Sequence, residues 1–181
     1  MRAGEDNERA TVEAACQGDK AALATLYERY YTTIVWVAYS VLLDRALAED
    51  AAQQAFAKAC VKLRSLKQPG RFGPWLTTIC RNGAQDMMRA RRRDTLLHQA
   101  VAADTPAQTS SNGFNRAVRD AVDSLPAMYR EVIVLHYYNQ MSYREIESVL
   151  GLSRDVVKGR LARARRQMQA HLEREGFRRE Q

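Results

Sequence analysis

The chain has 181 residues, enough for one domain or two small ones. Its apolar fraction of 46% can support hydrophobic cores and excludes wholesale disorder. Its net charge of +7 favours an anionic partner. The three cysteines, Cys16, Cys60 and Cys80, lie far apart and form no CxxC pair, so their spacing indicates neither a disulfide framework nor a zinc site.

No segment has the length and apolarity of a membrane span. The longest apolar stretch, residues 32–43, has about a dozen residues, whereas a helix that crosses a bilayer needs roughly 20. The first ten residues, MRAGEDNERA, have no apolar core and are unlike a signal peptide. We therefore expect a soluble cytoplasmic protein that is not embedded in a membrane.

Helical periodicity dominates the N-terminal half. Apolar residues recur at i, i+4 and i+7 over residues 23–41, and a second apolar stripe covers residues 52–66. Asp19 is placed to cap the first of these helices. After the turn KQPGRFGP, Pro74 fits the first turn of a third helix that includes Trp75. No window shows the two-residue alternation of a strand, so we expect no sheet.

The composition changes after the third helix. The stretch ADTPAQTSSNGFN contains Pro106, Gly113 and several Ser and Thr residues, which is typical of a flexible polar linker. We therefore expect an all-α protein made of two small helical domains. In chain order, the expected parts are a disordered tail (1–14), an N-terminal domain (15–93), the linker (94–115), a C-terminal domain (116–172) and a second tail (173–181).

The C-terminal part contains the signals of a helix-turn-helix. Ser142 followed by Glu145 is a capping box that starts a short helix. Gly151 suits the left-handed residue that ends that helix, and Ser153 can cap the next one. A short capped helix, a glycine turn and a second helix form the motif whose second helix enters the DNA major groove.

That second helix is strongly basic. It places Val157, Leu161, Ala164 and Met168 on one face, and cations cover most of the remaining surface. The basic residues of the stretch LSRDVVKGRLARARRQM are Arg154, Lys158, Arg160, Arg163, Arg165 and Arg166. Such a face is compatible with simple solvation, a membrane surface or a nucleic acid, and the helix-turn-helix context favours nucleic acid.

A second basic cluster lies in the N-terminal part. The stretch RNGAQDMMRARRRD contains Arg81, Arg89, Arg91, Arg92 and Arg93. Two cationic helices in two linked domains suggest that the protein holds one duplex at two points. Phosphate contacts of this kind give an affinity that depends steeply on salt.

Three blocks of the sequence resemble the extracytoplasmic-function (ECF) sigma factors of bacterial RNA polymerase. AEDAAQQAFAKA is similar to the family's AED-x-x-Q-x-x-F block, and PWLTTICRNGAQDMMRARRR to its W-L-x-x-I-x-R-N block. The stretch AVDSLPAMYREVIVLHYYNQMSYREIESVLGLSRDVVKGRLARARRQM resembles the third block, which contains the helix-turn-helix. Order and spacing agree over about residues 15–172. A helix-turn-helix alone is a weak signal, but three blocks in order are a strong one.

The resemblance implies that the first block faces the clamp of core RNA polymerase. By position, Asp50, Gln53, Gln54 and Phe56 would lie on this helix or support it. Alternatively, Phe56 is a core residue, and Asp50 and Gln53 are simply solvated.

The resemblance also implies that the second block captures the promoter −10 element as a single strand. The matching residues are Lys67, Arg71, Phe72, Arg81, Asn82, Asp86, Arg89, Arg92 and Arg93. The loop from Lys67 to Phe72 matches the place where the family holds a flipped base, which requires a shaped pocket because unstacking costs a few kcal/mol. Asp86 could instead form a surface ion pair with an arginine, and Trp75 could be core rather than a stacking platform.

In the second domain, the resemblance implies a helix that reads the −35 element as duplex. The matching residues are Ser153, Arg154, Asp155, Lys158, Arg160 and Arg163. Sequence does not separate the arginines that read bases from those that bind phosphate. Val156 and Gly159 stand where the family usually has Thr and Ser, and these departures concern the contacts rather than the fold.

These features predict an alternative sigma factor that binds core polymerase and promoter DNA, with an anti-sigma factor as a further partner. A sigma-factor mimic that only sequesters an anti-sigma factor is the alternative, and the two basic clusters argue against it. A plain repressor would leave the AED block unexplained. His98, His136 and His171 are far apart and pair with no ligand or nucleophile motif, so we expect no enzyme, metal, cofactor or small-molecule substrate.

Overall fold

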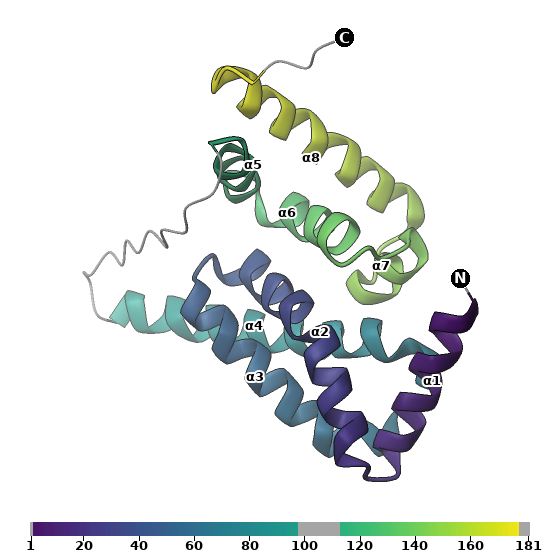
Figure 1. Cartoon of the computed structure of the whole chain (residues 1–181). Helices are drawn as coiled ribbons and strands as arrows, with labels where there is room; N and C mark the ends of the chain where they lie inside the picture. The colour runs from purple at the N-terminus through teal and green to yellow at the C-terminus, as the bar shows by residue number, and fades with distance from the viewer. Residues whose placement is uncertain (1, 98–112, 178–181) are drawn as a thin grey trace. The chain divides into compact units, whose positions relative to one another are not determined.

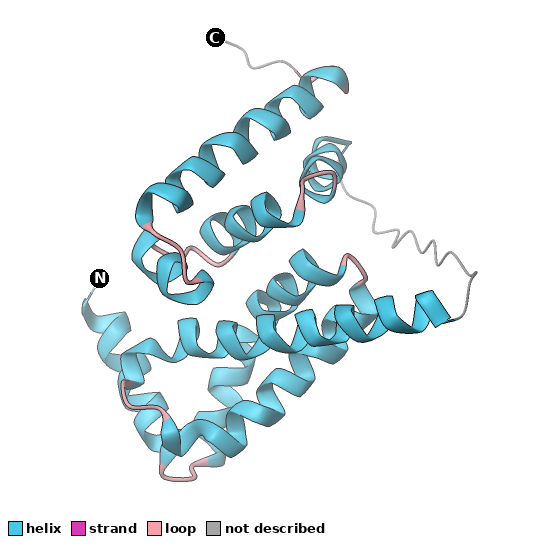
Figure 2. Cartoon of the chain, turned by 180° about the vertical axis from the view of Figure 1, so that it is seen from behind, coloured by secondary structure: helices cyan, strands magenta, loops and turns pink. Residues whose placement is uncertain are grey.

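A computed structural model describes residues 2–97 and 113–177, and all regular structure within these ranges is helical. The chain divides into two compact units with the boundary after His98. Figure 1 labels the helices of both units, and Figure 2, viewed from behind, shows helices and loops but no strand among the described residues. The expectation of an all-α protein with two helical domains is confirmed. Residues 98–112, most of the predicted linker, lie outside the described ranges.

The first unit is built around three mutually packed helices, α2 (Lys20–Leu42), α3 (Arg45–Lys62) and α4 (Phe72–Leu97). Figure 1 shows α4 crossing α2 and α3. The inner face of α3 is made mostly of alanine, which lets its neighbours approach closely. The buried side chains include Leu26, Ile34, Val37 and Ala38 of α2, Ala48, Ala51, Ala52, Ala55 and Phe56 of α3, and Leu76, Cys80 and Ala84 of α4.

Side-chain caps explain where these helices begin. The Asp19 carboxylate accepts hydrogen bonds from the backbone N–H groups of Ala21 and Ala22, at 2.8 and 3.2 Å, so the predicted cap of α2 is confirmed. Asp44 caps α3 in the same way through the N–H of Leu47. Pro74 lies in the first turn of α4, as predicted, although the helix itself begins two residues earlier, at Phe72.

The N-terminal segment differs from the expected disordered tail at residues 1–14. Instead, α1 (Arg2–Cys16) is a helix that packs on α2. Its Val12 and Ala15 are fully buried, and its Glu8 accepts a 2.7 Å hydrogen bond from the Tyr30 hydroxyl of α2. The order of this segment therefore comes from tertiary contacts, which the polar sequence MRAGEDNERA does not reveal.

The second unit contains α5 (Gly113–Asp123), α6 (Ala127–Ile133), α7 (Tyr143–Leu150) and α8 (Arg154–Arg174). After α6 the chain widens into a single π-helical turn, η3 (Val134–Tyr138). Figure 1 shows α8 running along the other helices of this unit. Compared with the predicted bounds, α4 extends beyond residue 93, α5 begins before residue 116, and α8 ends beyond residue 172.

The signals predicted for the helix-turn-helix are present with one difference. The Ser142 hydroxyl and the Glu145 carboxylate form the reciprocal capping box at the start of α7. Gly151 ends α7 with φ +65°, the left-handed conformation that glycine adopts without strain. Ser153 occupies the N-cap position of α8 with an extended backbone, but its side chain makes no capping hydrogen bond.

Candidate nucleic-acid and polymerase interfaces

The α8 helix is attached to its domain by a narrow apolar stripe. Val157, Leu161 and Ala164 are at most 1% exposed and pack on the second unit, whereas Met168 is half-buried. The side chains of Arg154, Asp155, Lys158 and Arg163 are exposed, and Arg160 is half-buried. The helix is therefore packed on the second unit by its apolar stripe and exposes a wide cationic surface, as its sequence predicted.

The cations at the start of α8 are not neutralised by any carboxylate in the described part of the chain. Among residues 2–97 and 113–177, no ion pair joins Arg154, Lys158 or Arg163 to a carboxylate. Asp155 lies in the first turn, where its charge complements the helix dipole. Ser153 is exposed at the N-cap position, and its side chain accepts no hydrogen bond from the N–H groups that begin the helix. This end of α8 has the chemistry of a phosphate-binding surface.

Gly159 of α8 is not required by packing. A Cβ built at this position would have no atom within 4 Å outside the local backbone of its own helix. The protein itself would thus accommodate a side chain here, and the small residue leaves a flat spot on the cationic surface. The exposed Val156 lies near it and carries no hydroxyl for a phosphate.

The basic surface of α4 is partly neutralised, unlike that of α8. Arg89 is 3.0 Å from Asp86, so the alternative interpretation of Asp86 as an ion-pair partner agrees with the structure. Both side chains are about 70% exposed, and such surface pairs contribute little to stability. Arg91 reaches Asp44, the N-cap of α3, at 3.5 Å. Asp44 thus caps one helix and holds the basic end of another.

Most of the residues of α4 that were predicted to contact DNA lie on one face of the helix. Asn82 and Arg93 are exposed, and Arg81 is half-buried. Asn82, Asp86, Arg89 and Arg93 follow each other at helical spacings of four, three and four residues, so they share one face. The Arg92 side chain lies outside the described part of the structure.

Two 3₁₀ turns, η1 (Leu63–Ser65) and η2 (Pro69–Arg71), form the loop between α3 and α4. The side chains of Lys67 and Arg71 are exposed on this loop. Phe72 was expected among the DNA contacts, but it is only 3% exposed and its ring packs against Tyr30, with 5.3 Å between ring centroids. Phe72 therefore belongs to the core, and we remove it from the candidate DNA-binding surface. Trp75 is half-buried, with its ring 5.9 Å from that of Phe72.

The outer face of α3 carries the residues predicted to face polymerase. Asp50, Gln53 and Gln54 are all exposed, opposite the buried alanines of the same helix. Phe56 is 9% exposed and its ring lies 4.7 Å from that of Tyr27, so it supports the helix from within the core. Val61, the residue before the last of α3, is 84% exposed, and the sequence analysis did not identify it.

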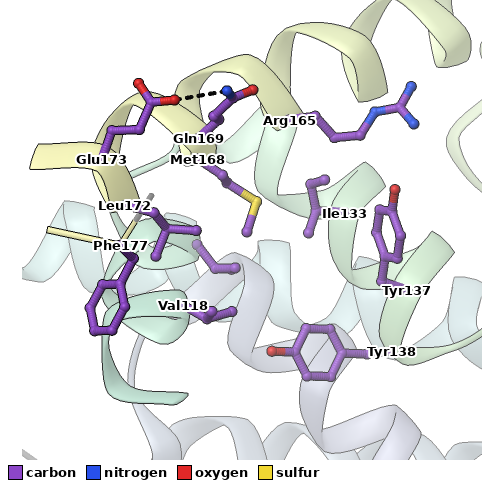
Figure 3. Close-up of a pocket in the computed structure, with 11 residues that line it drawn as sticks. Val118, Ile133, Tyr137, Tyr138, Arg165, Met168, Gln169, Leu172, Glu173 and Phe177 are labelled. Atoms are coloured by element: carbon purple, nitrogen blue, oxygen red, sulfur yellow. Dashed lines mark hydrogen bonds between the residues drawn. The ribbon is translucent and has the colours of Figure 1, made fainter. Parts of the chain in front are cut away.

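An apolar groove on the second unit was also missed. It has a volume of about 670 Å³, and Figure 3 shows the side chains that line it. They are Val118 and Val122 of α5, Ile133, Tyr137 and Tyr138 around the π turn, Arg165, Met168, Gln169, Leu172 and Glu173 of α8, and Phe177 beyond it. Residues far apart in sequence meet here, and Phe177 falls in a segment that was expected to be a tail. Exposed apolar surface of this kind marks protein-binding sites.

The groove has a polar rim. Gln169 donates a 2.8 Å hydrogen bond to Glu173 at one edge, and Figure 3 shows Arg165 further along α8. Tyr137 is 51% exposed at the opposite wall. Burial raises the pKa of Tyr138, an effect that Arg119 opposes and Asp123 reinforces. The hydroxyl therefore stays protonated at neutral pH.

One of the three cysteines is buried, and no group of metal ligands is found in the described part of the chain. Burial raises the pKa of the Cys80 thiol to about 12, which makes it inert at neutral pH. Within residues 2–97 and 113–177, no three His, Cys, Asp or Glu side chains are grouped so that they could hold a metal ion. Nor does any helix of these residues have the length and apolarity needed to cross a membrane.

Comparison with known proteins agrees with this arrangement. A family model of sigma-70 region 2 matches residues 26–94, and one of sigma-70 region 4 matches residues 115–168. The chain is 34% identical to a probable RNA polymerase sigma factor, RfaY of Xanthomonas campestris, over 83% of this chain and 40% of that one. It is 29% identical to the ECF sigma factor SigW of Bacillus subtilis, over 86% and 91% of the two chains.

Two solved structures are similar over most of the chain. One is CnrH, a sigma factor of Cupriavidus metallidurans, in complex with the cytosolic domain of CnrY; it has a TM-score of 0.70 and 30% identity over 92% of this chain and 97% of that one. The other is the sigma factor RpoE of Bartonella quintana with the anti-sigma factor NepR, with a TM-score of 0.71 and 28% identity over 83% and 96%. The chain belongs to the sigma-70 family of RNA polymerase sigma factors, and within that family to the ECF group.

Proposed function

We propose that this protein is an alternative sigma factor that binds core RNA polymerase and directs transcription from the promoters it selects. The observation that carries the proposal is the pair of cationic helices, α4 and α8, each on its own helical unit of the sigma-70 family. Because the two units are separate, they can engage two elements of one promoter. In this proposal the chain supplies binding surfaces, and the chemistry of RNA synthesis belongs to the polymerase.

Each surface has a proposed role. The N-terminal end of α8, with Ser153, Arg154, Asp155, Lys158, Arg160 and Arg163, reads the −35 element in the major groove. The −10 element is engaged by the exposed face of α4, which carries Asn82, Asp86, Arg89 and Arg93. The half-buried Arg81 and the loop residues Lys67 and Arg71 contribute as well, and Arg92 is included by its place in the sequence. Exposed side chains in the middle of α3, Asp50, Gln53 and Gln54, bind core polymerase, with Phe56 supporting them.

An anti-sigma factor is the proposed regulatory partner, and the proposed location of the protein is the cytoplasm. The support is the groove on the second unit, which exposes apolar side chains, together with the two similar sigma factors, one solved with the cytosolic domain of CnrY and the other with the anti-sigma factor NepR. A mimic that only sequesters such a partner is not favoured, because it would not need the unpaired cations of α8.

The test is in vitro transcription with purified core polymerase and a library of genomic fragments, with and without the full chain. New discrete start sites that share two upstream elements are the expected result. Tight binding to core polymerase without new transcripts would support the mimic instead. Specific DNA binding without polymerase binding would indicate a free-standing repressor.

A further inference from the structure

The loop between α3 and α4 has few contacts of its own that fix its position. Two of its backbone hydrogen bonds are local, from Leu66 N–H to Leu63 O at 3.0 Å and from Arg71 N–H to Gln68 O at 2.9 Å. Bonds of this range define the shape of each turn but not where the turns lie against the domain. The exposed Lys67 and Arg71 therefore depend on other elements for their placement.

The C-terminal end of this loop is tied to α1 through Tyr30 of α2. The Tyr30 hydroxyl donates a 2.7 Å hydrogen bond to Glu8 of α1, and Arg29 also reaches Glu8, at 3.2 Å. The Glu8 side chain is only 17% exposed, so this is a partly buried, charge-assisted contact. The Tyr30 ring packs edge-on against Phe72, the first residue after the loop.

Gly73 shows how closely the chain passes Tyr30. A Cβ at this position would lie 3.0 Å from Cε1 and 3.2 Å from the hydroxyl oxygen of Tyr30. Any larger residue would therefore push on the ring that holds Glu8. The glycine is explained by this close approach, since its backbone conformation does not require one.

The N-terminal end of the loop is also tied to α1. The Cys16 thiol lies 3.5 Å from the carbonyl oxygen of Leu63, where the loop begins. Glu8 and Cys16 are eight residues apart on α1, or about 12 Å at 1.5 Å per residue. Between these two points α1 packs against both η1 and η2.

We propose that α1 is a brace that positions the loop, and that the Glu8–Tyr30 contact makes the choice of −10 base depend on this helix. Glu8 and Tyr30 do not touch DNA in this proposal; they are positioning residues that act through Phe72 and Gly73 on Lys67 and Arg71. The inference rests on the proposed function, because it assigns the loop to recognition of the −10 element.

The first test replaces Tyr30 by Phe in the full chain, which removes the hydroxyl and keeps the ring. Amide hydrogen exchange of loop residues 66–68, 70 and 71 should become about fivefold faster, the factor expected from loss of one ordinary hydrogen bond. Transcription by polymerase loaded with the variant is then measured on promoters with every single base change in the −10 element. We expect discrimination between −10 bases to fall about fivefold while discrimination between −35 bases stays unchanged.

Two further variants separate positioning from a general loss of stability. Gly73→Ala should disturb Tyr30 by contact, yet alanine is the better helix former, so the domain should not lose helix propensity. It is expected to reduce −10 discrimination in the same direction as Tyr30→Phe. Tyr27→Phe is the matched control, because it removes a hydroxyl from the same helix at a ring that packs on Tyr31 and Phe56.

The outcomes distinguish the brace from the proposed function. If the wild-type chain shows no dependence on −10 sequence, the proposed function fails. If it does, but Tyr30→Phe and Gly73→Ala retain wild-type −10 preferences, the brace is wrong. An equal decrease in transcription at all promoters would also overturn the brace, and so would an equal loss of −10 discrimination in Tyr27→Phe. Either result indicates a merely structural effect.

Discussion

The two basic helices of this protein, α4 and α8, look alike in sequence but differ in how the fold holds and neutralises them. Arg89 and Arg91 of α4 have carboxylate partners at 3.0 and 3.5 Å, in Asp86 and Asp44. The cations at the start of α8 have none in the described part of the chain. The electrostatic attraction of α8 for phosphate is therefore undiminished, whereas that of α4 is moderated by its own domain.

The two helices also differ in their attachment. The α4 helix is one of three mutually packed helices, with Leu76, Cys80 and Ala84 buried between its neighbours. The α8 helix depends on the stripe Val157, Leu161 and Ala164. The comparison teaches that a similar run of arginines serves two kinds of surface. The α8 helix offers unpaired cations to a DNA duplex. The α4 helix offers a face whose positive charge is partly neutralised, beside the loop that precedes it.

The largest expected effect tests the attachment of α8. Leu161→Ala removes a side chain that is 1% exposed and should lower the unfolding free energy of the second unit by about 3 kcal/mol. Both tryptophans, Trp36 and Trp75, belong to the first unit, so their fluorescence reports that unit alone. In urea titrations the circular dichroism transition of the second unit should move, while the fluorescence transition stays in place. A shift of the fluorescence midpoint would show that the units unfold together.

The next effect tests the free cations of α8. Arg154→Ala combined with Lys158→Ala should weaken binding to −35 duplex by about 10- to 100-fold and reduce the salt slope by about two. Fluorescence anisotropy at several salt concentrations measures both quantities. Arg9→Ala with Arg174→Ala removes the same charge from residues that already bond within their own helices, so it is the control. Wild-type affinity in the α8 variant would contradict its role as recognition helix.

A third prediction concerns the outer face of α3, which is polar but carries little charge. Asp50→Ala combined with Gln53→Ala should weaken binding to core polymerase about tenfold, since two exposed polar contacts of about 0.5–1.5 kcal/mol each are lost. Unlike the α8 variant, it should leave binding of the free chain to −35 duplex unchanged. Glu13→Ala with Gln17→Ala changes similar exposed residues, one near the end of α1 and one in the turn after it, and should have no effect on either. Unchanged polymerase affinity would place the contact elsewhere.

The smallest effect tests the neutralised cation of α4. Asp86→Asn releases Arg89 and should tighten non-specific DNA binding about two- to threefold at low salt, with a stability change within about 0.5 kcal/mol. Asp120→Asn makes the same change of charge on α5 and releases Arg116, which is 3.9 Å away, so it controls for net charge and for release of an arginine outside α4. If both variants bind equally well, the partial neutralisation of α4 has no bearing on DNA.

Much of the local structure could be predicted from sequence because it depends on neighbours in the chain. The cap at Asp19, the capping box of Ser142 and Glu145 and the left-handed Gly151 are all short-range features. The apolar stripe of α8 follows from helical spacing alone, and its opposite face is cationic wherever the helix packs. The two-unit helical fold, the helix-turn-helix and the exposure of the α3 residues were accessible for this reason.

Other features were decided only by the tertiary structure. Periodicity shows which face of a helix is apolar but not which neighbour covers it. It therefore did not reveal the hydrogen bond between Glu8 and Tyr30, which helps to fix α1 on α2. Nor did it reveal that Phe72 is buried in the core. The groove combines α5, the π turn and the end of α8, so no local pattern predicts it. Tertiary structure also decides whether an arginine meets a distant carboxylate. Folding brings Asp44 to Arg91 of α4, whereas it brings no carboxylate of the described residues to the cations at the start of α8.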